Sequence, residues 1–158
     1  MKKINWTELF IFILIAELVG AFSALLSGDF SSFYAEITRP PFSPPPVVFP
    51  VVWSVLYALM GISTFLVWNE KFCPTSKSTA KKLYISQLTI NFTWSIIFFR
   101  FRLLGLAAAI AFLLLGLVTG MIFSFRKINT TAAIINIPYT LWLTFAAYLA
   151  SGVFFLNI

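Results

Sequence analysis

Histidine is absent from this sequence of 158 residues, cysteine occurs once, at Cys73, and charged residues make up only 10% of the chain. Zinc sites, disulfide frameworks and Cys–His nucleophile pairs need more of these residues than one subunit supplies. We therefore expect neither a metal site nor a cofactor. The scarcity of charge also argues against an ordinary soluble domain, in which about a quarter of the residues are charged.

Hydrophobic residues are abundant instead, at 60% of the chain, and the mean hydropathy is +0.95. A membrane-spanning helix needs roughly 20 apolar residues, so a chain of this length holds about five spans and no separate soluble domain. The composition predicts an all-α, polytopic membrane protein, with residues 1–158 forming one domain, a bundle of five transmembrane helices. The expected spans are 9–26, 49–68, 83–99, 103–125 and 132–155, and the first loop is 27–48.

The formal net charge is +6, but the basic residues lie in short connections rather than in a stripe interleaved with aromatic residues. This distribution argues against a nucleic-acid partner and fits the excess of Lys and Arg in cytoplasmic loops. With the N-terminus inside, the outer segments hold Arg39, Arg100 and Arg102, and the inner segments hold Lys2, Lys3, Lys71, Lys77, Lys81, Lys82, Arg126 and Lys127. We expect the first loop and the C-terminus to face outward, and Cys73 to lie on the reducing side.

The stretch Tyr34–Gly61 joins a proline-rich loop to the start of a span. Five prolines within Pro40–Pro46 forbid a regular helix, because proline lacks an amide hydrogen and pushes the preceding residue into extended geometry. Pro50 falls in the first turn of the next span, where a helix tolerates proline. Trp53 and Tyr57 then recur at helical spacing. We expect a stiff lid beside an aromatic helix face.

The next connection, residues 69–82, is polar and broken by Pro74, which predicts a segment outside the membrane and a helix that starts at Leu83. The third span that follows has one polar and aromatic face, which should point into the bundle: Gln87, Asn91, Trp94, Ser95 and Phe98. Such a face either holds helices together by hydrogen bonds or contacts a ligand.

Glu17 lies inside the first apolar run, where the core of a signal peptide would not place a carboxylate, so we keep this run as a membrane span. An acid within a span is either a functional group or a hydrogen-bonded packing residue. In the fourth span, Gly116 and Gly120 form a small-xxx-small pattern, which brings helices close together either within one subunit or in a homodimer.

In the last span, Pro138 should bend the helix and free the carbonyl of Ile134. Asn136 and Thr140 are near enough to satisfy loose backbone groups at the bend. Beyond it, one helix face carries Tyr139, Trp142 and Ala146. A small residue beside a tryptophan leaves space, and space lined by aromatic residues suits a flat ligand.

Four segments, in order along the chain, resemble those of the translocator protein family, also called tryptophan-rich sensory proteins. They are Phe33-Tyr-Ala…Arg39-Pro-Pro-Phe-Ser-Pro-Pro in the first loop, Val52-Trp-Ser-Val-Leu-Tyr-Ala-Leu-Met-Gly, Asn91-Phe-Thr-Trp-Ser-Ile-Ile-Phe-Phe and Pro138-Tyr-Thr-Leu-Trp-Leu-Thr-Phe-Ala. The resemblance implies a five-helix bundle, often dimeric, whose pocket opens under the first loop and binds porphyrins such as protoporphyrin IX.

Position by position, the resemblance assigns pocket walls to Trp53, Asn91, Trp94, Trp142 and Ala146, and a lid to Tyr34, Pro44 and Pro45. The helical faces described above add Tyr57, Ser95, Phe98 and Tyr139, and Arg39 or the Tyr34 hydroxyl would meet a carboxylate tail at the mouth. The chain departs from the family at Leu149-Ala-Ser-Gly, which lacks the usual Asn and the basic segment associated with sterols.

We expect a membrane receptor or carrier for tetrapyrroles and related flat hydrophobic ligands, in a bacterial cytoplasmic membrane. Whether the protein is also an enzyme stays open. The alternative is light-dependent porphyrin degradation, with Trp53 and Trp142 as the reactive indoles. A third interpretation, drawn from Glu17 alone, is a proton-coupled small-molecule exporter.

Overall fold

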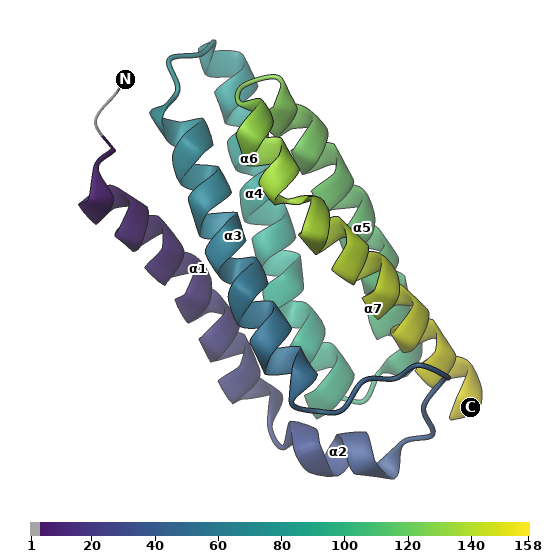
Figure 1. The fold of residues 1–158 in the computed structure, drawn as a ribbon. Helices are drawn as coiled ribbons and strands as arrows, with labels where there is room; N and C mark the ends of the chain where they lie inside the picture. Colours follow the sequence, from purple (N-terminus) through teal and green to yellow (C-terminus); the bar gives the residue numbers. More distant parts are fainter. Residues whose placement is uncertain (1–3) are drawn as a thin grey trace.

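The computed structural model describes residues 4–158, and within that range it contains seven α-helices, one π-helical turn and no strand (Figure 1). The all-α prediction is therefore confirmed for these residues. The elements are α1 (Trp6–Ser27), α2 (Phe30–Glu36), α3 (Val48–Asn69), α4 (Pro74–Ser95), the π-helical turn Ile96–Arg100, α5 (Leu104–Arg126), α6 (Thr130–Ile135) and α7 (Ile137–Leu156).

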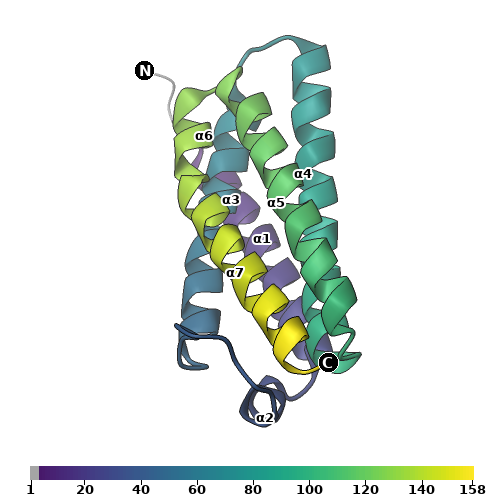
Figure 2. The ribbon, with the colours of Figure 1, turned by 90° about the vertical axis from the view of Figure 1, so that its right-hand side faces the viewer.

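The long helices run side by side, so their connections gather at two ends of the bundle (Figures 1 and 2). The start of α1, the α3–α4 turn and the α5–α6 turn share one end, which we call the lysine end. The short helix α2, residues 37–47, the turn before α5 and the C-terminus share the other. We call α2 together with residues 37–47 the lid, because this segment crosses that end of the bundle.

Small residues allow α1 and α3 to pack closely. A Cβ atom on Gly61 would lie 2.6 Å from the Cα of Ile13, and one on Gly20 would overlap the ring of Tyr57. Ala16 on α1 is fully buried in the core. Larger side chains at these positions would push the two helices apart.

The Gly116/Gly120 pair does not bring two helices of this chain close together. Nothing lies within 4 Å of a Cβ placed on Gly116, and for Gly120 the nearest atom is Leu83 Cδ2, at 4.0 Å. Among the described residues, glycine permits close helix contacts at Gly20 and Gly61 between α1 and α3, and at Gly105, where a Cβ would lie 2.9 Å from the Phe154 ring on α7.

Amide and phenol side chains bond to one another in the interior. The Tyr139 hydroxyl donates to Gln87 Oε1 at 2.9 Å, and Asn91 Nδ2 donates to the Tyr57 hydroxyl oxygen at 3.1 Å. Gln87 and Tyr139 have no exposed surface, and Asn91 is 2% exposed. Because buried polar groups are costly unless paired, these bonds favour one rotation of α4 against α3 and α7. The prediction that the polar face of the third span points inward is confirmed.

The helical start expected at Leu83 is wrong: α4 begins at Pro74. Proline occupies the beginning of the helix, where its missing amide hydrogen costs nothing. The first turns of α4 are polar, with Lys77 and Lys81 among them, so the helix extends past its apolar part. A second difference is that the expected first loop contains α2, which Asp29 caps by accepting hydrogen bonds from the amides of Ser31 and Ser32.

The bend predicted from Pro138 is confirmed. The helix is interrupted at Asn136, between α6 and α7. Asn136 Nδ2 donates to the carbonyl of Ala132 at 2.8 Å, and Thr140 Oγ1 lies 3.5 Å from the carbonyl of Asn136. These side chains satisfy backbone groups at the break, as an interrupted helix in a membrane requires.

Among the described residues, four helical segments are long and apolar enough to cross a membrane: α1, α3, α5 and the run Thr130–Leu156. The helix α4 is not in this set, because polar residues are spread along it, from the lysines of its first turns to Gln87 and Asn91. Large apolar side chains cover the outside of the bundle, including Leu25 at 78% exposure and Leu141 at 66%. Such a surface suits hydrocarbon and not water. Crossing of the membrane by α4 stays a prediction.

Candidate ligand pocket beneath the lid

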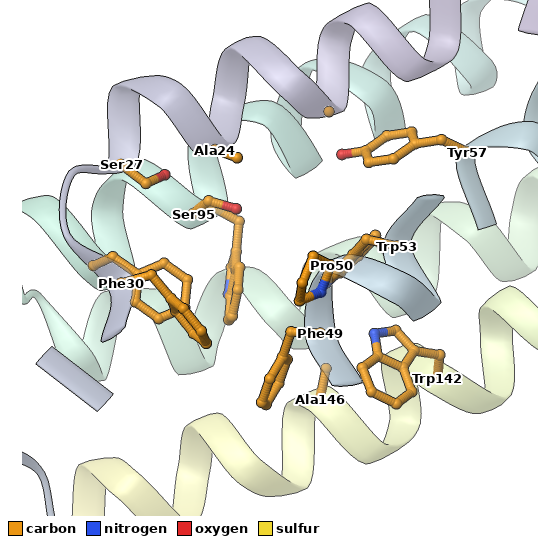
Figure 3. A pocket seen from close by; sticks show the side chains of 13 residues that line it. Ala24, Ser27, Phe30, Phe49, Pro50, Trp53, Tyr57, Ser95, Trp142 and Ala146 are labelled. Atoms are coloured by element: carbon orange, nitrogen blue, oxygen red, sulfur yellow. The ribbon is translucent and has the colours of Figure 1, made fainter. Parts of the chain in front are cut away.

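A cavity of about 200 Å³ lies between the helices beneath the lid (Figure 3). Residues from five helices and the π-helical turn line it, and most of them are apolar or aromatic. They are Gly20, Ala24, Ser27, Phe30, Phe49, Pro50, Trp53, Tyr57, Trp94, Ser95, Phe99, Trp142 and Ala146.

The wall on α3 follows from helical spacing. Trp53 and Tyr57 are one turn apart, and their ring centroids are 5.7 Å apart. The helix α7 supplies Trp142 and Ala146 to the same cavity. Figure 3 shows the methyl group of Ala146 and the nitrogen edge of the Trp142 indole on the cavity side. The space therefore exists because alanine, and not a larger residue, stands one turn after the tryptophan.

Aromatic rings close the lid end of the cavity. Phe30 on α2 stacks on Tyr34 with centroids 5.5 Å apart, and meets Phe49 and Phe99 edge to face at 5.7 and 4.9 Å. Such edge-to-face pairs are a favoured geometry for aromatic rings. The cluster joins the lid to the first turn of α3 and to the π-helical turn.

The lid is fixed by hydrogen bonds. The Tyr34 hydroxyl donates to the carbonyl of Pro44 at 2.6 Å, which ties α2 to the proline segment. The Tyr148 hydroxyl on α7 donates to the carbonyl of Pro41 at 3.0 Å. The side-chain oxygen of Asn157 accepts from the amide of Thr38, and its nitrogen donates to the carbonyl of the same residue. The lid is thus attached to the C-terminal helix as well as to α3.

The Asp29 cap gives the lid a titratable group. The backbone N–H of Ser32 is the main cause that lowers the pKa of this carboxyl, with further hydrogen bonds from the Ser32 side chain and the Ser31 backbone. Hydrogen bonds to the ionised form always favour it. Asp29 therefore stays charged and capping down to a lower pH than a free aspartate would.

Few polar groups face the cavity. The indole nitrogen of Trp142 is buried and, among the described residues, has no hydrogen-bond partner. The indole nitrogen of Trp94, by contrast, donates to the carbonyl of Ala107 at 2.9 Å. The Tyr57 hydroxyl accepts from Asn91 and points toward α1 in Figure 3. The Trp142 N–H is thus unpaired, and a ligand acceptor would reach it only after neighbouring atoms move aside.

A smaller cavity of about 30 Å³ adjoins the first. The two share the lining residues Phe49, Trp94, Phe99 and Ala146. Tyr34, Arg39, Ser43 and Phe98 also line the smaller cavity, together with apolar residues of the lid and α7. The guanidinium of Arg39 lies over the Tyr34 ring, 4.7 Å from its centroid. A cation is thus placed beside the main pocket.

Six of the residues expected in the site line the main pocket: Trp53, Tyr57, Trp94, Ser95, Trp142 and Ala146. Tyr34, Arg39 and Phe98 line the smaller cavity, and Asn91 lines a crevice of about 10 Å³ behind Trp53 and Trp94. Tyr139 is fully buried beneath the pocket, with its ring 6.1 Å from that of Trp53. Pro44 and Pro45 belong to the lid but line neither cavity; their carbonyls accept from Tyr34 and from the amide of Val48.

Glu17 does not line the pocket. It is half-buried on α1, one turn before the pocket residue Gly20, and close enough to Tyr57 to interact with it electrostatically.

The sequence does not reveal the contributions of α1 and α2, nor Phe49, Pro50 and Phe99. The small residues of α1 recur at spacings of four and three, at Gly20, Ala24 and Ser27. This pattern is the one sequence signal that indicates a shared face on α1. Phe99 was missed for another reason. The π-helical turn Ile96–Arg100 changes the rotation per residue, so the α-helical period that selected Phe98 does not hold there.

Comparison with known proteins agrees with this architecture. The sequence model of the TspO/MBR family matches residues 12–156. The chain is 33% identical over 138 residues to the translocator protein of Homo sapiens, covering 85% of this chain and 82% of that protein. It is 30% identical over 152 residues to the tryptophan-rich protein TspO of Archaeoglobus fulgidus, covering 91% and 96%. It is also 27% identical over 144 residues to the tryptophan-rich sensory protein of Cereibacter sphaeroides, covering 91% and 87%.

Proposed function

The chain belongs to the TspO/MBR family of integral membrane proteins, and we propose that it is a receptor or carrier that binds tetrapyrroles such as protoporphyrin IX in the pocket beneath the lid. The observation that carries the proposal is a cavity walled by three indoles, those of Trp53, Trp94 and Trp142, with one buried indole N–H unpaired. Ring faces stack on a flat macrocycle, and the N–H meets an acceptor on it.

The volume of the cavity limits which ligands fit in it without a conformational change. The cavity of about 200 Å³ is smaller than the roughly 300–1,000 Å³ of pockets that enclose drug-sized ligands. The rings of Phe49 and Phe99 line both this cavity and the smaller one. Rotation of these rings would join the two spaces, but the smaller one adds only about 30 Å³, so a bound porphyrin also requires the lid and the helices to move apart. A porphyrin bound across both would lay its macrocycle between the indoles and extend a carboxylate tail toward Arg39, which can hold a carboxylate through two N–H groups.

Binding is tested by adding protoporphyrin IX to the purified protein and following tryptophan fluorescence and porphyrin absorbance. The decisive variant is Ala146→Phe, which fills the cavity, and its matched control is Thr144→Phe, which adds the same ring to the exposed face of α7. We expect binding to weaken at least about tenfold in the first variant and to be kept in the second. Unchanged spectra at micromolar porphyrin, or equal binding by both variants, would reject the proposal.

A second candidate, light-dependent degradation of bound porphyrin, is favoured by one feature. Trp53 and Trp142 line the same cavity, and Trp53 also contacts the rings of Tyr57 and Tyr139 at 5.7 and 6.1 Å. Such an array could supply electrons to an excited porphyrin. Under illumination in air, loss of porphyrin should slow in Trp53→Phe/Trp142→Phe when the bound fraction is matched to wild type. Equal rates would exclude a reactive role for the two indoles. No feature of the described residues favours an exporter that uses Glu17.

We place the protein in a bacterial cytoplasmic membrane with five spans, α4 being the third. In support, Lys71, Lys77, Lys81, Lys82, Arg126 and Lys127 lie at the lysine end, while Arg39, Arg100 and Arg102 lie at the lid end. Lys2 and Lys3, which also entered the count of inner charges, lie outside the described residues. The bias favours an inner lysine end and an outer lid. A homodimer that uses the open surface at Gly116 fits this arrangement.

A further inference from the structure

A separate cavity lies at the lysine end, far from the pocket beneath the lid. It has a volume of about 230 Å³ and lies between the last turn of α3 and the first turns of α4. Its lining residues are Trp68, Pro74, Lys77, Ser78 and Lys81. Two of these are cations and none is an acid. Tetrapyrrole binding beneath the lid does not involve this cavity.

The two lysines are held in place by Trp68. Lys77 Nζ donates a hydrogen bond of 2.8 Å to the backbone carbonyl of Trp68, a group that the end of α3 leaves without a helical partner. Lys81 Nζ lies over the Trp68 ring, 6.0 Å from its centroid. On α1, Phe12 contacts the same indole, with centroids 6.1 Å apart. Lys77 is therefore half-buried at the cavity, and Lys81 lines the same cavity beside Trp68 while its side chain stays exposed.

Both ammonium groups keep donors for an anion. Lys77 uses one of its three N–H groups on Trp68, and no ion pair joins either lysine to a carboxylate within residues 4–158. The Ser78 hydroxyl adds a further donor to the cavity wall. Cations and a hydroxyl, with no competing acid, form a site for a phosphate group.

The position of the cavity indicates where that phosphate comes from. Trp68 stands one residue before the end of α3, a membrane-spanning helix, and tryptophan is enriched at the boundary between hydrocarbon and water. Lys77, Lys81 and Ile85 follow one another at intervals of four along α4, so they share a face. Ile85 is 50% exposed. This face changes from cationic to apolar in the direction of the bilayer, as a phospholipid changes from headgroup to acyl chain.

We propose that the lysine end carries a binding site for an anionic phospholipid, with the phosphate between Lys77 and Lys81 and an acyl chain along Ile85. Basic pockets between membrane helices are suited to anionic headgroups, and each lysine near the surface strengthens the attraction. The site does not depend on tetrapyrrole binding or on which side of the membrane the lysine end faces.

The test measures lipid selectivity. The protein is reconstituted in nanodiscs of equal parts phosphatidylglycerol and phosphatidylcholine, and the lipids that stay bound are identified by native mass spectrometry. We expect wild type to retain phosphatidylglycerol preferentially, and Lys77→Gln/Lys81→Gln to lose about tenfold or more of that preference. The matched control, Lys82→Gln/Lys127→Gln, removes two charges from the same end at residues that do not line the cavity, and it should retain the preference.

Three outcomes would overturn the proposal. The first is that wild type shows no preference for phosphatidylglycerol. The second is an equal loss of preference in the two double variants, which would mean that only total charge matters. The third is displacement of the lipid by millimolar inorganic phosphate, which would mean a site for free anions. Because Lys77 also caps α3, unfolding of its variant is checked by the thermal midpoint. If it unfolds, Lys81→Gln alone, which keeps that cap, must still reduce the preference, and Lys81→Arg must keep it.

Discussion

The side-chain amide of Asn91 donates a hydrogen bond of 3.1 Å to the hydroxyl oxygen of Tyr57, and this bond connects α4 to the wall of the pocket. Both residues are buried, and Asn91 lines a crevice behind the pocket instead of the pocket itself. Asn91 therefore acts on the pocket wall through its hydrogen bond to Tyr57. It is a positioning residue: its amide sets where the phenol ring stands.

The Tyr57–Asn91 bond should contribute measurably to stability. Tyr57→Phe removes the hydroxyl and leaves the buried amide of Asn91 without a partner, so we expect a loss of about 1–3 kcal/mol in the free energy of unfolding. Tyr57→Phe/Asn91→Leu removes both polar groups and should recover most of this loss. Thermal unfolding in one detergent measures both. A double variant that is less stable than the single variant would contradict this explanation.

The two indole nitrogens at the pocket should behave differently when each tryptophan becomes phenylalanine. Trp94→Phe breaks a hydrogen bond to Ala107, and Trp142→Phe breaks none among the described residues. We expect Trp94→Phe to be less stable than Trp142→Phe by about 1 kcal/mol. Porphyrin affinity should show the opposite order and fall up to about tenfold in Trp142→Phe. Melting and titration experiments on the two variants in parallel measure both quantities. Equal effects of the two variants on porphyrin affinity would show that the Trp142 N–H does not contact the ligand.

Acid should release the cap of the lid helix. The folded pKa of Asp29 is lowered by the Ser32 backbone N–H, so the cap's stabilising effect is complete above about 3.9, the usual value for aspartate. The effect is lost as pH falls through the lower folded pKa. Hydrogen exchange at the amides of residues 31–36 should therefore accelerate relative to the core in strong acid. Asp29→Asn keeps a capping oxygen but cannot titrate, so its relative exchange should not change with pH. Identical pH profiles of exchange in wild type and Asp29→Asn would exclude Asp29 as the cause of the faster exchange in acid.

Cys73 provides a test of orientation, because it is the single cysteine of the chain and is exposed at the lysine end. The backbone N–H of Thr75 is the main cause that lowers the pKa of this thiol, which raises its thiolate fraction near neutral pH. With the lysine end inside, a membrane-impermeant maleimide should label Cys73 in inverted vesicles and not in intact cells. Ser31→Cys/Cys73→Ser, with its cysteine on the exposed lid, should show the reverse. Labelling of Cys73 in intact cells would show that the lysine end faces outward, opposite to the proposed topology.

Much of the pocket follows from the sequence, because helical period places residues on shared faces and the family resemblance indicates which of those residues form pocket walls. Trp53 and Tyr57 on α3, and Trp142 and Ala146 on α7, are each about one turn apart. On α4, Trp94 and Ser95 follow Asn91 by three and four residues. These spacings place each set on one helix face, and the structure brings the three faces together. The same reasoning selected Phe98 in place of Phe99, because the π-helical turn breaks the period there.

The sequence by itself determined that this chain is an all-helical membrane protein, that the polar face of its third long helix turns inward and that its last helix breaks near Pro138. Composition and periodicity are local properties, and each of these conclusions needs only a segment. Only the tertiary structure decided which small residues of α1 reach the pocket, that Phe30, Phe49 and Phe99 close it, and that Trp94 has a partner for its indole nitrogen where Trp142 has none. Those facts depend on the distances between segments far apart in the chain, which are set by close packing of the whole bundle.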